Sequence, residues 1–200
     1  REDPAEPFVP AQEDLDEYFD DLLGHRCSMK RLDISHQDLM RQINFYYSCV
    51  SFVDYQVGRI IQALKDKGMY DDTLIVFTSD HGDMMGDYNC IGKRVMVNSA
   101  CHVPYMVRCP GVAPGRRSDV VSLVDIAPTM LSYAGIPYDK DEYDGIDVFA
   151  GQDRSYVYSQ FGFGKKGTYM VTDGTNKLCY SGKSGKYYFF ETCPEEKNVY

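Results

Sequence analysis

The most constraining feature of the sequence is a run of about thirty residues in which apolar side chains recur every three or four positions. This spacing predicts one long helix with a single apolar face. Ser35 followed three residues later by Asp38 predicts the start of the helix, and Gly68 predicts its end. We expect the apolar face to pack into a core; its residues are Leu39, Ile43, Tyr46, Tyr47, Val50, Val53, Val57, Ile60, Ile61 and Leu64.

The segment that follows this helix predicts a buried strand. Residues 74–78 form a short apolar run after the Asp71-Asp72 turn, which is typical of a strand covered on both faces in a parallel sheet. Residues 105–109 predict a second strand. Residues 126–134 predict a further helix that is capped by Asp125. We therefore assign the α/β class to this part of the chain.

The pattern changes after about residue 153. Short, Tyr-rich segments separated by turn residues predict an antiparallel meander, with turns at Asp173-Gly174 and Ser184-Gly185; the segments are 156–160, 168–172, 177–180 and 187–191. We predict two units, an α/β region over residues 1–152 and a small antiparallel subdomain over residues 153–200. Residues 1–24 are expected to form a loop and a short acidic helix.

Composition excludes several classes of function. The chain carries 21 basic and 30 acidic residues, a net charge of −9, whereas a non-specific nucleic-acid binder needs a basic surface. No apolar run approaches the ~18 residues of a membrane-spanning helix. The seven cysteines include no C-x-x-C pair, so we interpret them as reduced thiols that pack as small apolar groups. The cysteines do not indicate in which cellular compartment the protein works.

The residues after the first strand pattern carry the chemistry. Asp80 and His81 follow the carboxyl end of a strand, where open α/β sheets bind their ligands. A carboxylate and an imidazole in one turn can both point toward a divalent cation, and Gly82 lets the backbone turn tightly around it. Lys93 can bring a cation to an oxyanion held there. The alternative is a capped turn without function.

A wider pattern of residues resembles the sulfatase family of the alkaline-phosphatase superfamily. The run Phe77-Thr78-Ser79-Asp80-His81-Gly82, with Gly86-Asp87 and a Lys thirteen positions after Asp80, resembles the family's second signature. Further similar segments are Tyr46–Ile60, His102–Gly111, Asp125–Pro137 and Glu195–Asn198. The resemblance implies a mostly parallel sheet of the sulfatase type, flanked by helices, with the small antiparallel meander at its C-terminal end.

The resemblance also implies roles for individual residues. Asp80 and His81 are expected to bind a divalent metal ion, Ca²⁺ in the first place, and Lys93 is expected to bind the sulfate group. His102 either contacts the substrate or packs beneath the neighbouring strand. Its His-Val-Pro context is similar to that of the iduronate-sulfatase branch. The implied substrate is a sulfated small molecule or a sulfated carbohydrate.

One part of the family pattern is absent from this sequence. Sulfatases attack sulfur with a formylglycine made from the Cys or Ser of a C/S-x-P-x-R motif, and Cys193-Pro194-Glu195 does not match it. We therefore interpret the chain as the C-terminal part of a sulfatase. It would hold half of an active site that the N-terminal part of the same protein completes, and by itself it is expected to be inactive.

Two other functions remain open from the sequence. One is a phosphoester or phosphonate hydrolase of the same superfamily, which shares the Asp-His metal pair. The other is a protein that binds sulfated glycans without turnover, which the absent nucleophile favours. Residues 163–187 contain five Lys and one Asp among several Tyr, so they form either a solvated hairpin or a pocket for an anionic sugar.

Overall fold

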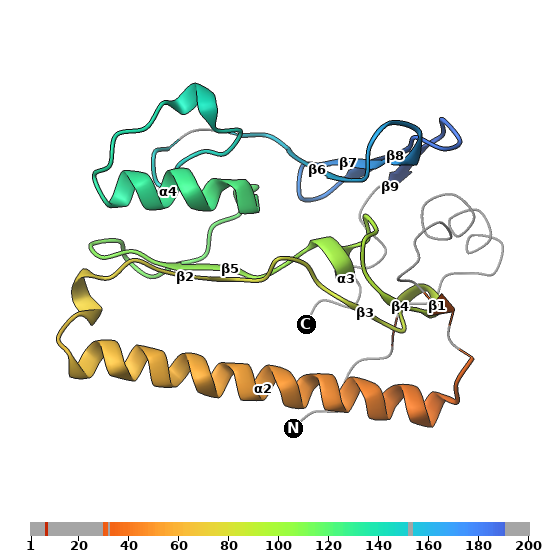
Figure 1. Cartoon of the computed structure of the whole chain (residues 1–200), viewed down its shortest axis with the longest axis horizontal. Coiled ribbons are helices and arrows are strands. Elements are labelled where there is room, and N and C mark those ends of the chain that lie inside the picture. Colours follow the sequence, from red (N-terminus) through yellow and green to blue (C-terminus); the bar gives the residue numbers. More distant parts are fainter. Residues whose placement is uncertain (1–6, 8–29, 32, 152–153, 191–200) are drawn as a thin grey trace.

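The computed structural model describes residue 7 and residues 30–31, 33–151 and 154–190 (Figure 1). Helix α2 (His36–Asp66) lies along one side of a two-stranded sheet, β2 (Ile75–Thr78) and β5 (Tyr105–Arg108), and helix α4 (Ile126–Tyr133) lies on the other side. Short 3₁₀ turns join the elements: η2 (Tyr70–Asp72), η3 (Asp87–Asn89), η4 (Leu123–Asp125), η5 (Lys140–Glu142) and η6 (Gly164–Lys166). The predicted acidic helix within residues 1–24 and the segment 195–198 fall outside the described residues.

Both ends of α2 agree with the sequence prediction. The Ser35 hydroxyl accepts a hydrogen bond from the Asp38 backbone N–H at 3.1 Å and donates one to the Asp38 carboxylate at 2.7 Å. At the other end Gly68 adopts a left-handed conformation with φ 66°, which stops the helix. In the part of the chain that the structure describes, no helix combines the length and apolar character needed to span a bilayer.

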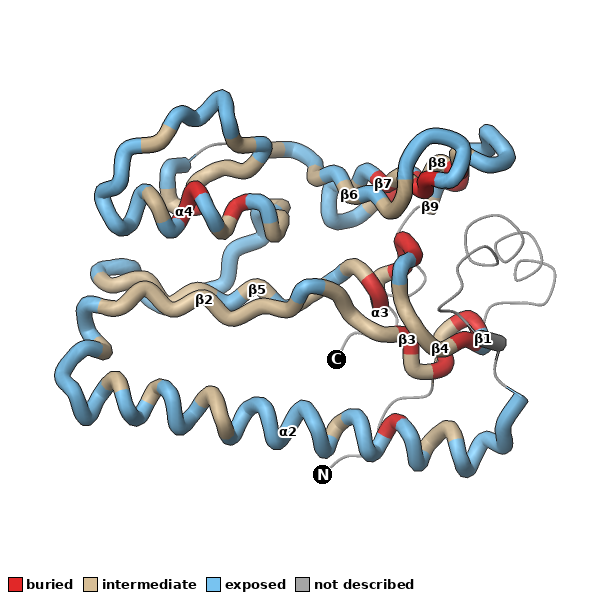
Figure 2. The backbone as a smooth tube through the Cα atoms, in the orientation of Figure 1, coloured by how far each residue is buried: buried red, intermediate tan, exposed pale blue. Residues whose placement is uncertain are grey.

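The predicted burial of the apolar face of α2 is wrong for the described residues. Ile43 is the one buried residue of this helix (Figure 2). A single line of half-buried side chains continues along the same face: Leu39, Tyr47, Val57, Ile61 and Leu64. The remaining large apolar residues are exposed: Phe45, Tyr46, Val50, Phe52, Val53, Tyr55 and Ile60. A two-stranded sheet is too narrow to cover a helix of 31 residues on more than one line.

The two central strands occur where they were predicted, but their pairing differs. β2 and β5 run antiparallel, with Ile75 opposite Arg108 and Thr78 opposite Tyr105, and β2 is half-buried instead of covered on both faces. The connection between them contains no long crossover helix, so β5 enters the sheet from the end at which β2 leaves it. The other edge of β2 pairs with no strand of the described residues.

The connection between β2 and β5 forms small elements that the sequence did not predict. Strand β4 (Cys90–Gly92) pairs antiparallel with β3 (Met84–Met85) on one side and with β1 (Lys30–Arg31) on the other. The short helix α3 (Asn98–Cys101) follows. Lys93 and His102 both lie in this connection between β2 and β5.

The C-terminal meander is confirmed. Strands β6 (Val157–Phe161), β7 (Thr168–Thr172), β8 (Lys177–Ser181) and β9 (Tyr187–Phe190) pair antiparallel in sequence order. Gly174 and Gly185 have φ angles of 89° and 73°, as the predicted turns require.

The main apolar core lies between this sheet and residues 84–100. Met170, Cys179 and Tyr188 from the sheet pack into one cluster with residues of the connection between β2 and β5: Met84, Tyr88, Cys90, Val95, Met96, Val97 and Ala100. The buried Lys177 donates a hydrogen bond of 2.6 Å to the Asn98 side chain across the same contact. The proposed boundary between two units at residue 152 stays a prediction. Cys49 and Cys109 carry free thiols, as predicted. Cys27 and Cys193 lie outside the described residues, so their reduced state stays a prediction.

Asp125 does not cap α4 with its side chain, in contrast to the prediction. It is fully buried, and its carboxylate accepts hydrogen bonds from the Ser122 backbone N–H at 2.7 Å and the Ile146 backbone N–H at 2.9 Å. Both terminal nitrogens of Arg154 also donate to it. The carboxylate therefore joins three segments: the turn before α4, the chain after α4, and the start of the C-terminal region.

Replacing this carboxylate tests its structural role. Asp125→Ala leaves the Arg154 guanidinium and two backbone N–H groups without their acceptor, so we expect the free energy of unfolding to fall by about 3–5 kcal/mol. Chemical denaturation measures the loss. Asp119→Ala removes an exposed partner of Arg117 and serves as the control, which should be near neutral. Equal effects of the two substitutions would contradict the assignment.

Candidate metal and anion site

The candidate site begins where β2 ends, and local hydrogen bonds shape its loop. The Ser79 hydroxyl donates to the carbonyl oxygen of His81 at 2.8 Å, and the His81 backbone N–H donates to the Asp80 carboxylate at 2.9 Å. The second of these bonds is the main reason that the pKa of Asp80 lies below its usual value. Asp80 is therefore an ionised carboxylate at neutral pH, as a metal ligand must be.

The structure brings the two predicted metal ligands together. Nε2 of His81 lies 3.3 Å from Oδ2 of Asp80, while Nδ1 of His81 lies 2.8 Å from the Gly82 carbonyl oxygen. In the tautomer that carries its proton on Nδ1, His81 donates to the Gly82 carbonyl and its Nε2 lone pair is available beside the carboxylate for a shared cation. Two ligand atoms bound at right angles to one ion lie roughly 3.0–3.7 Å apart, so the pair fits a shared cation.

Glycine at position 82 is required by the contact between this loop and α3. The Gly82 backbone N–H donates to the Ala100 carbonyl at 2.8 Å, and a Cβ atom at Gly82 would lie 2.0 Å from the Ser99 carbonyl oxygen. No side chain fits at that distance. The backbone of α3 therefore sets the position of the loop that carries Asp80 and His81.

Asp83 is a candidate that sequence reasoning did not assign. One of its carboxylate oxygens is buried and has no hydrogen-bond partner among the described residues. Burial raises the pKa of Tyr46 on α2, and the nearby charge of Asp83 adds to this effect. Its position two residues after His81 was the signal that could have identified it.

Lys93 lies in a segment whose backbone is held in unusual conformations. It is half-buried between Gly92, with φ 115°, and Arg94, with φ 76°. Tyr88 and Asn89, on the other side of β4, also have positive φ angles of 55° and 53°. Such conformations are unfavourable for residues other than Gly and cluster at functional sites. The buried side chains on both sides of Lys93 hold the strained segment in place.

His102 ends α3 and is exposed, so it does not pack beneath the neighbouring strand. Lys93 and His102 flank the segment that contains α3, and α3 contacts Gly82. Their roles in binding stay predictions. Among the described residues, no group of three or more His, Cys, Asp or Glu side chains is arranged to hold a metal ion. The role of Asp80 and His81 as metal ligands therefore stays a prediction.

Comparison with known proteins decides the family. The Sulfatase family model matches residues 4–136, which include the loop, Lys93 and His102. The chain belongs to the sulfatase family. An arylsulfatase of Clostridium perfringens is 28% identical over 83% of this chain and 37% of its own length. A choline-sulfatase of Rhizobium meliloti is 36% identical over 55% of this chain and 22% of its own length.

A solved structure confirms the fold. A phosphonate monoester hydrolase from Silicibacter pomeroyi matches with a TM-score of 0.81 and 23% identity, over 94% of this chain and 44% of that protein. The α/β class and the alkaline-phosphatase type of fold predicted from the sequence are therefore correct. This sulfatase chain spans less than half the length of the relatives reported above. The nearer similarity to iduronate sulfatases stays a prediction.

The contact at Gly82 gives a direct test of how the loop is positioned. Gly82→Ala places a methyl group against the Ser99 carbonyl, so we expect a stability loss of about 1–3 kcal/mol by thermal or chemical unfolding. Gly58→Ala is the matched control, because a Cβ there meets nothing within 4 Å and alanine favours the helix. The control should be neutral or stabilising. A neutral Gly82→Ala would contradict the close approach.

Proposed function

We propose that this chain is part of a sulfuric ester hydrolase and contributes half of its active site. The observation that carries the proposal is the Asp80–His81 pair, whose ligand atoms lie 3.3 Å apart at the end of β2 inside the region that matches the sulfatase family. Lys93, held in a strained and packed segment, supports it as the group that binds the sulfate. The proposed substrates are sulfated small molecules or sulfated carbohydrates.

The proposal assigns the remaining catalytic groups to an N-terminal part of the same protein. The sequence holds no C/S-x-P-x-R motif for a formylglycine nucleophile. Two features support a further partner region: the free edge of β2 within the described residues, and the exposed apolar side chains of α2. Polypeptide packed against these surfaces would bury them and bring its own ligands to the carboxyl end of β2.

The residues present fit a divalent cation, which we propose to be Ca²⁺. Asp80 offers a hard, anionic and exposed oxygen, and the Nε2 nitrogen of His81 lies 3.3 Å from it. Ca²⁺ takes six to eight oxygen ligands, so residues outside this chain and substrate oxygens must complete its shell. When bound, the cation would neutralise charge on the sulfate group.

Lys93 would act on the sulfate group by electrostatics. Negative charge on the leaving oxygen and the sulfuryl oxygens grows toward the transition state, so a fixed ammonium stabilises that state more than the bound substrate. The strained backbone beside Lys93 reduces the reorganisation needed to place its charge. His102 is exposed at the end of α3, and we propose that it contacts the substrate beyond the sulfate group.

A phosphonate or phosphate ester hydrolase is the second candidate, since the structure matched above shares the fold. The family match and the sulfatase relatives favour sulfate. The whole protein, assayed with one aryl alcohol esterified to sulfate, phosphate and phenylphosphonate, separates the two by kcat/KM. Preference for either phosphorus ester would overturn the proposal. Binding of sulfated glycans without turnover of any ester would favour the non-catalytic alternative.

Lys93→Ala tests the sulfate-binding role in the whole protein. We expect kcat to fall by ~10²–10³, the usual scale for the loss of one preorganised electrostatic group. Lys93→Arg should rescue only partly, because a planar guanidinium does not reproduce a compact ammonium. Lys140→Ala, at an exposed lysine of η5, is the control. Unchanged turnover would remove Lys93 from the site, and a large fall in melting temperature would make it structural.

Asp80→Asn tests the metal site. The substitution keeps the size of the side chain but removes its charge, so we expect metal affinity and turnover of the whole protein to fall together. Calorimetric titration with Ca²⁺ and aryl-sulfate turnover across a range of Ca²⁺ concentrations measure both effects. Asp144→Asn, at an exposed carboxylate, is the control. Turnover that falls without any change in metal affinity would contradict the role of Asp80 as a ligand.

A further inference from the structure

The outer face of the C-terminal sheet carries a row of aromatic rings. Tyr169, Tyr180 and Tyr187 lie opposite one another on β7, β8 and β9. Their ring centroids are 5.9 Å and 4.8 Å apart, with tilts of 34° and 37°. Neighbouring side chains on these strands face the core, so the alternation of a strand points the tyrosine row away from it.

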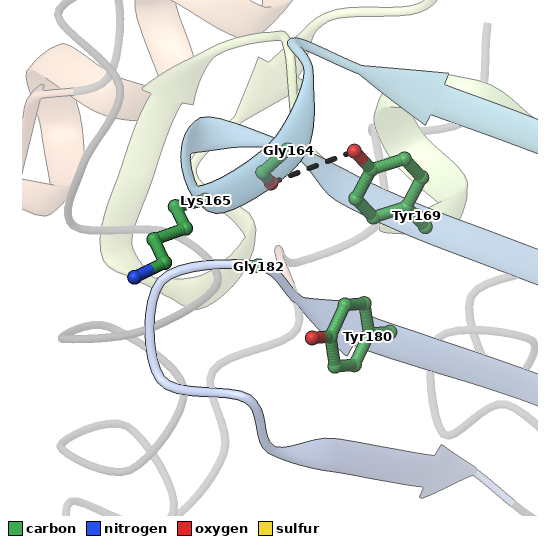
Figure 3. A pocket seen from close by; sticks show the side chains of 5 residues that line it. All are labelled: Gly164, Lys165, Tyr169, Tyr180 and Gly182. Atoms are coloured by element: carbon green, nitrogen blue, oxygen red, sulfur yellow. Dashed lines mark hydrogen bonds between the residues drawn. The ribbon is translucent and has the colours of Figure 1, made fainter.

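A cavity of about 380 Å³ lies at one end of this row. Its lining residues are Gly164, Lys165, Tyr169, Tyr180 and Gly182. Figure 3 shows the Tyr169 hydroxyl directed toward Gly164, in the turn that carries Lys165, while the Lys165 side chain points away from both rings. The Tyr169 hydroxyl donates to the Gly164 carbonyl at 3.5 Å. The lining therefore combines two flat rings and a phenol oxygen with an exposed lysine, whose long side chain is free to turn toward a ligand in the cavity.

Close backbone contacts hold the walls of this cavity. The Gly182 backbone N–H donates to the Gly167 carbonyl at 2.9 Å, and a Cβ atom at Gly182 would lie 2.1 Å from the Gly164 carbonyl oxygen. The turn between β6 and β7 and the start of the turn after β8 therefore pack backbone against backbone. A cavity built in this way is formed before any ligand arrives, which lowers the cost of binding.

The charge around the cavity differs from that of the chain. The whole chain has a net charge of −9, whereas residues 163–187 contain five Lys and one Asp. Lys177 is buried against Asn98, but the other four are exposed: Lys165, Lys166, Lys183 and Lys186. All four lie in the turns at the end of the sheet where the cavity opens. This end of the sheet therefore presents four exposed lysine residues in the described part of the chain.

We propose that this cavity binds a unit of a short sulfated saccharide, at a site built from other elements than the Asp80–His81 pair. The C–H faces of a sugar ring pack on the electron-rich faces of Tyr169 and Tyr180, while Lys165 and its neighbouring lysines contact sulfate groups. The rings select a ligand with flat apolar faces, and the lysines select an anionic one. The cavity volume suits one or two sugar rings, and the acidic remainder of the chain disfavours long polyanions.

Calorimetry on the whole protein tests this site. The probes are a dextran-sulfate hexasaccharide, the unsulfated hexasaccharide, a hexanucleotide and sodium sulfate, all titrated into an Asp80→Ala background that removes hydrolysis. We expect measurable binding of the sulfated hexasaccharide, weakened by added salt, with the other three probes binding at least tenfold more weakly. Equal binding of the unsulfated sugar, equal binding of the hexanucleotide, or no binding of the sulfated sugar would overturn the proposal.

Substitutions locate the binding in the cavity. Tyr180→Leu keeps an apolar side chain but removes the flat ring, so affinity should fall about 3- to 10-fold. Lys165→Ala changes an exposed residue without risk to the fold, and affinity should fall about 2- to 5-fold at low salt. The controls are Tyr156→Leu and Lys140→Ala, both exposed and outside the cavity. Loss of affinity in the controls, or none in the cavity variants, would overturn the assignment.

The same variants separate this site from the proposed hydrolysis. In the background with Asp80 intact, Tyr180→Leu and Lys165→Ala should leave the turnover of a small aryl sulfate unchanged, since that substrate has no saccharide to bind. A fall in that turnover would place these residues in the active site and overturn the proposal of a separate site. A whole protein without aryl-sulfate turnover would contradict the proposed function but leave saccharide binding measurable.

Discussion

The close approach of Gly82 to α3 is the constraint on which the rest of the candidate site depends. A backbone hydrogen bond to Ala100 and the absence of a side chain at Gly82 let the loop after β2 lie directly on the helix. The helix is in turn positioned by the apolar cluster between residues 84–100 and the C-terminal sheet. The geometry of the Asp80–His81 pair therefore depends on the packing of the loop on α3 and of α3 on the C-terminal sheet.

The C-terminal sheet has two faces with different tasks. Its inner face completes the core, and the buried Lys177 extends from it to hydrogen-bond with Asn98 at the beginning of α3. Its outer face is free of the core and presents tyrosines, and the turns at one end of the sheet carry exposed lysines. The alternation of side chains along a strand makes both tasks possible in one four-stranded sheet. A substitution on the outer face therefore need not disturb the packing that supports the loop after β2.

Much apolar surface of the sulfatase chain is exposed, and it lies around the central sheet. The exposed apolar side chains of α2 and the free edge of β2 among the described residues both border the central sheet. The apolar face of an amphipathic helix is stabilised when another surface covers it, and most of the large apolar side chains of α2 are exposed. The proposed ligands Asp80 and His81 lie at the end of β2, so the region that we propose to cover these surfaces would also reach the proposed metal site.

Local patterns in the sequence were sufficient to predict most elements and to place Asp80 beside His81. The caps of α2, the strands of the meander and the adjacency of Asp80 to His81 follow from residues near one another in the chain. The antiparallel pairing of β2 with β5, the role of Asp125 in binding Arg154, and the exposure of α2 depend on contacts between distant residues. Only the tertiary structure could decide them, since periodicity reports which side chains are apolar but not which surfaces are present to cover them.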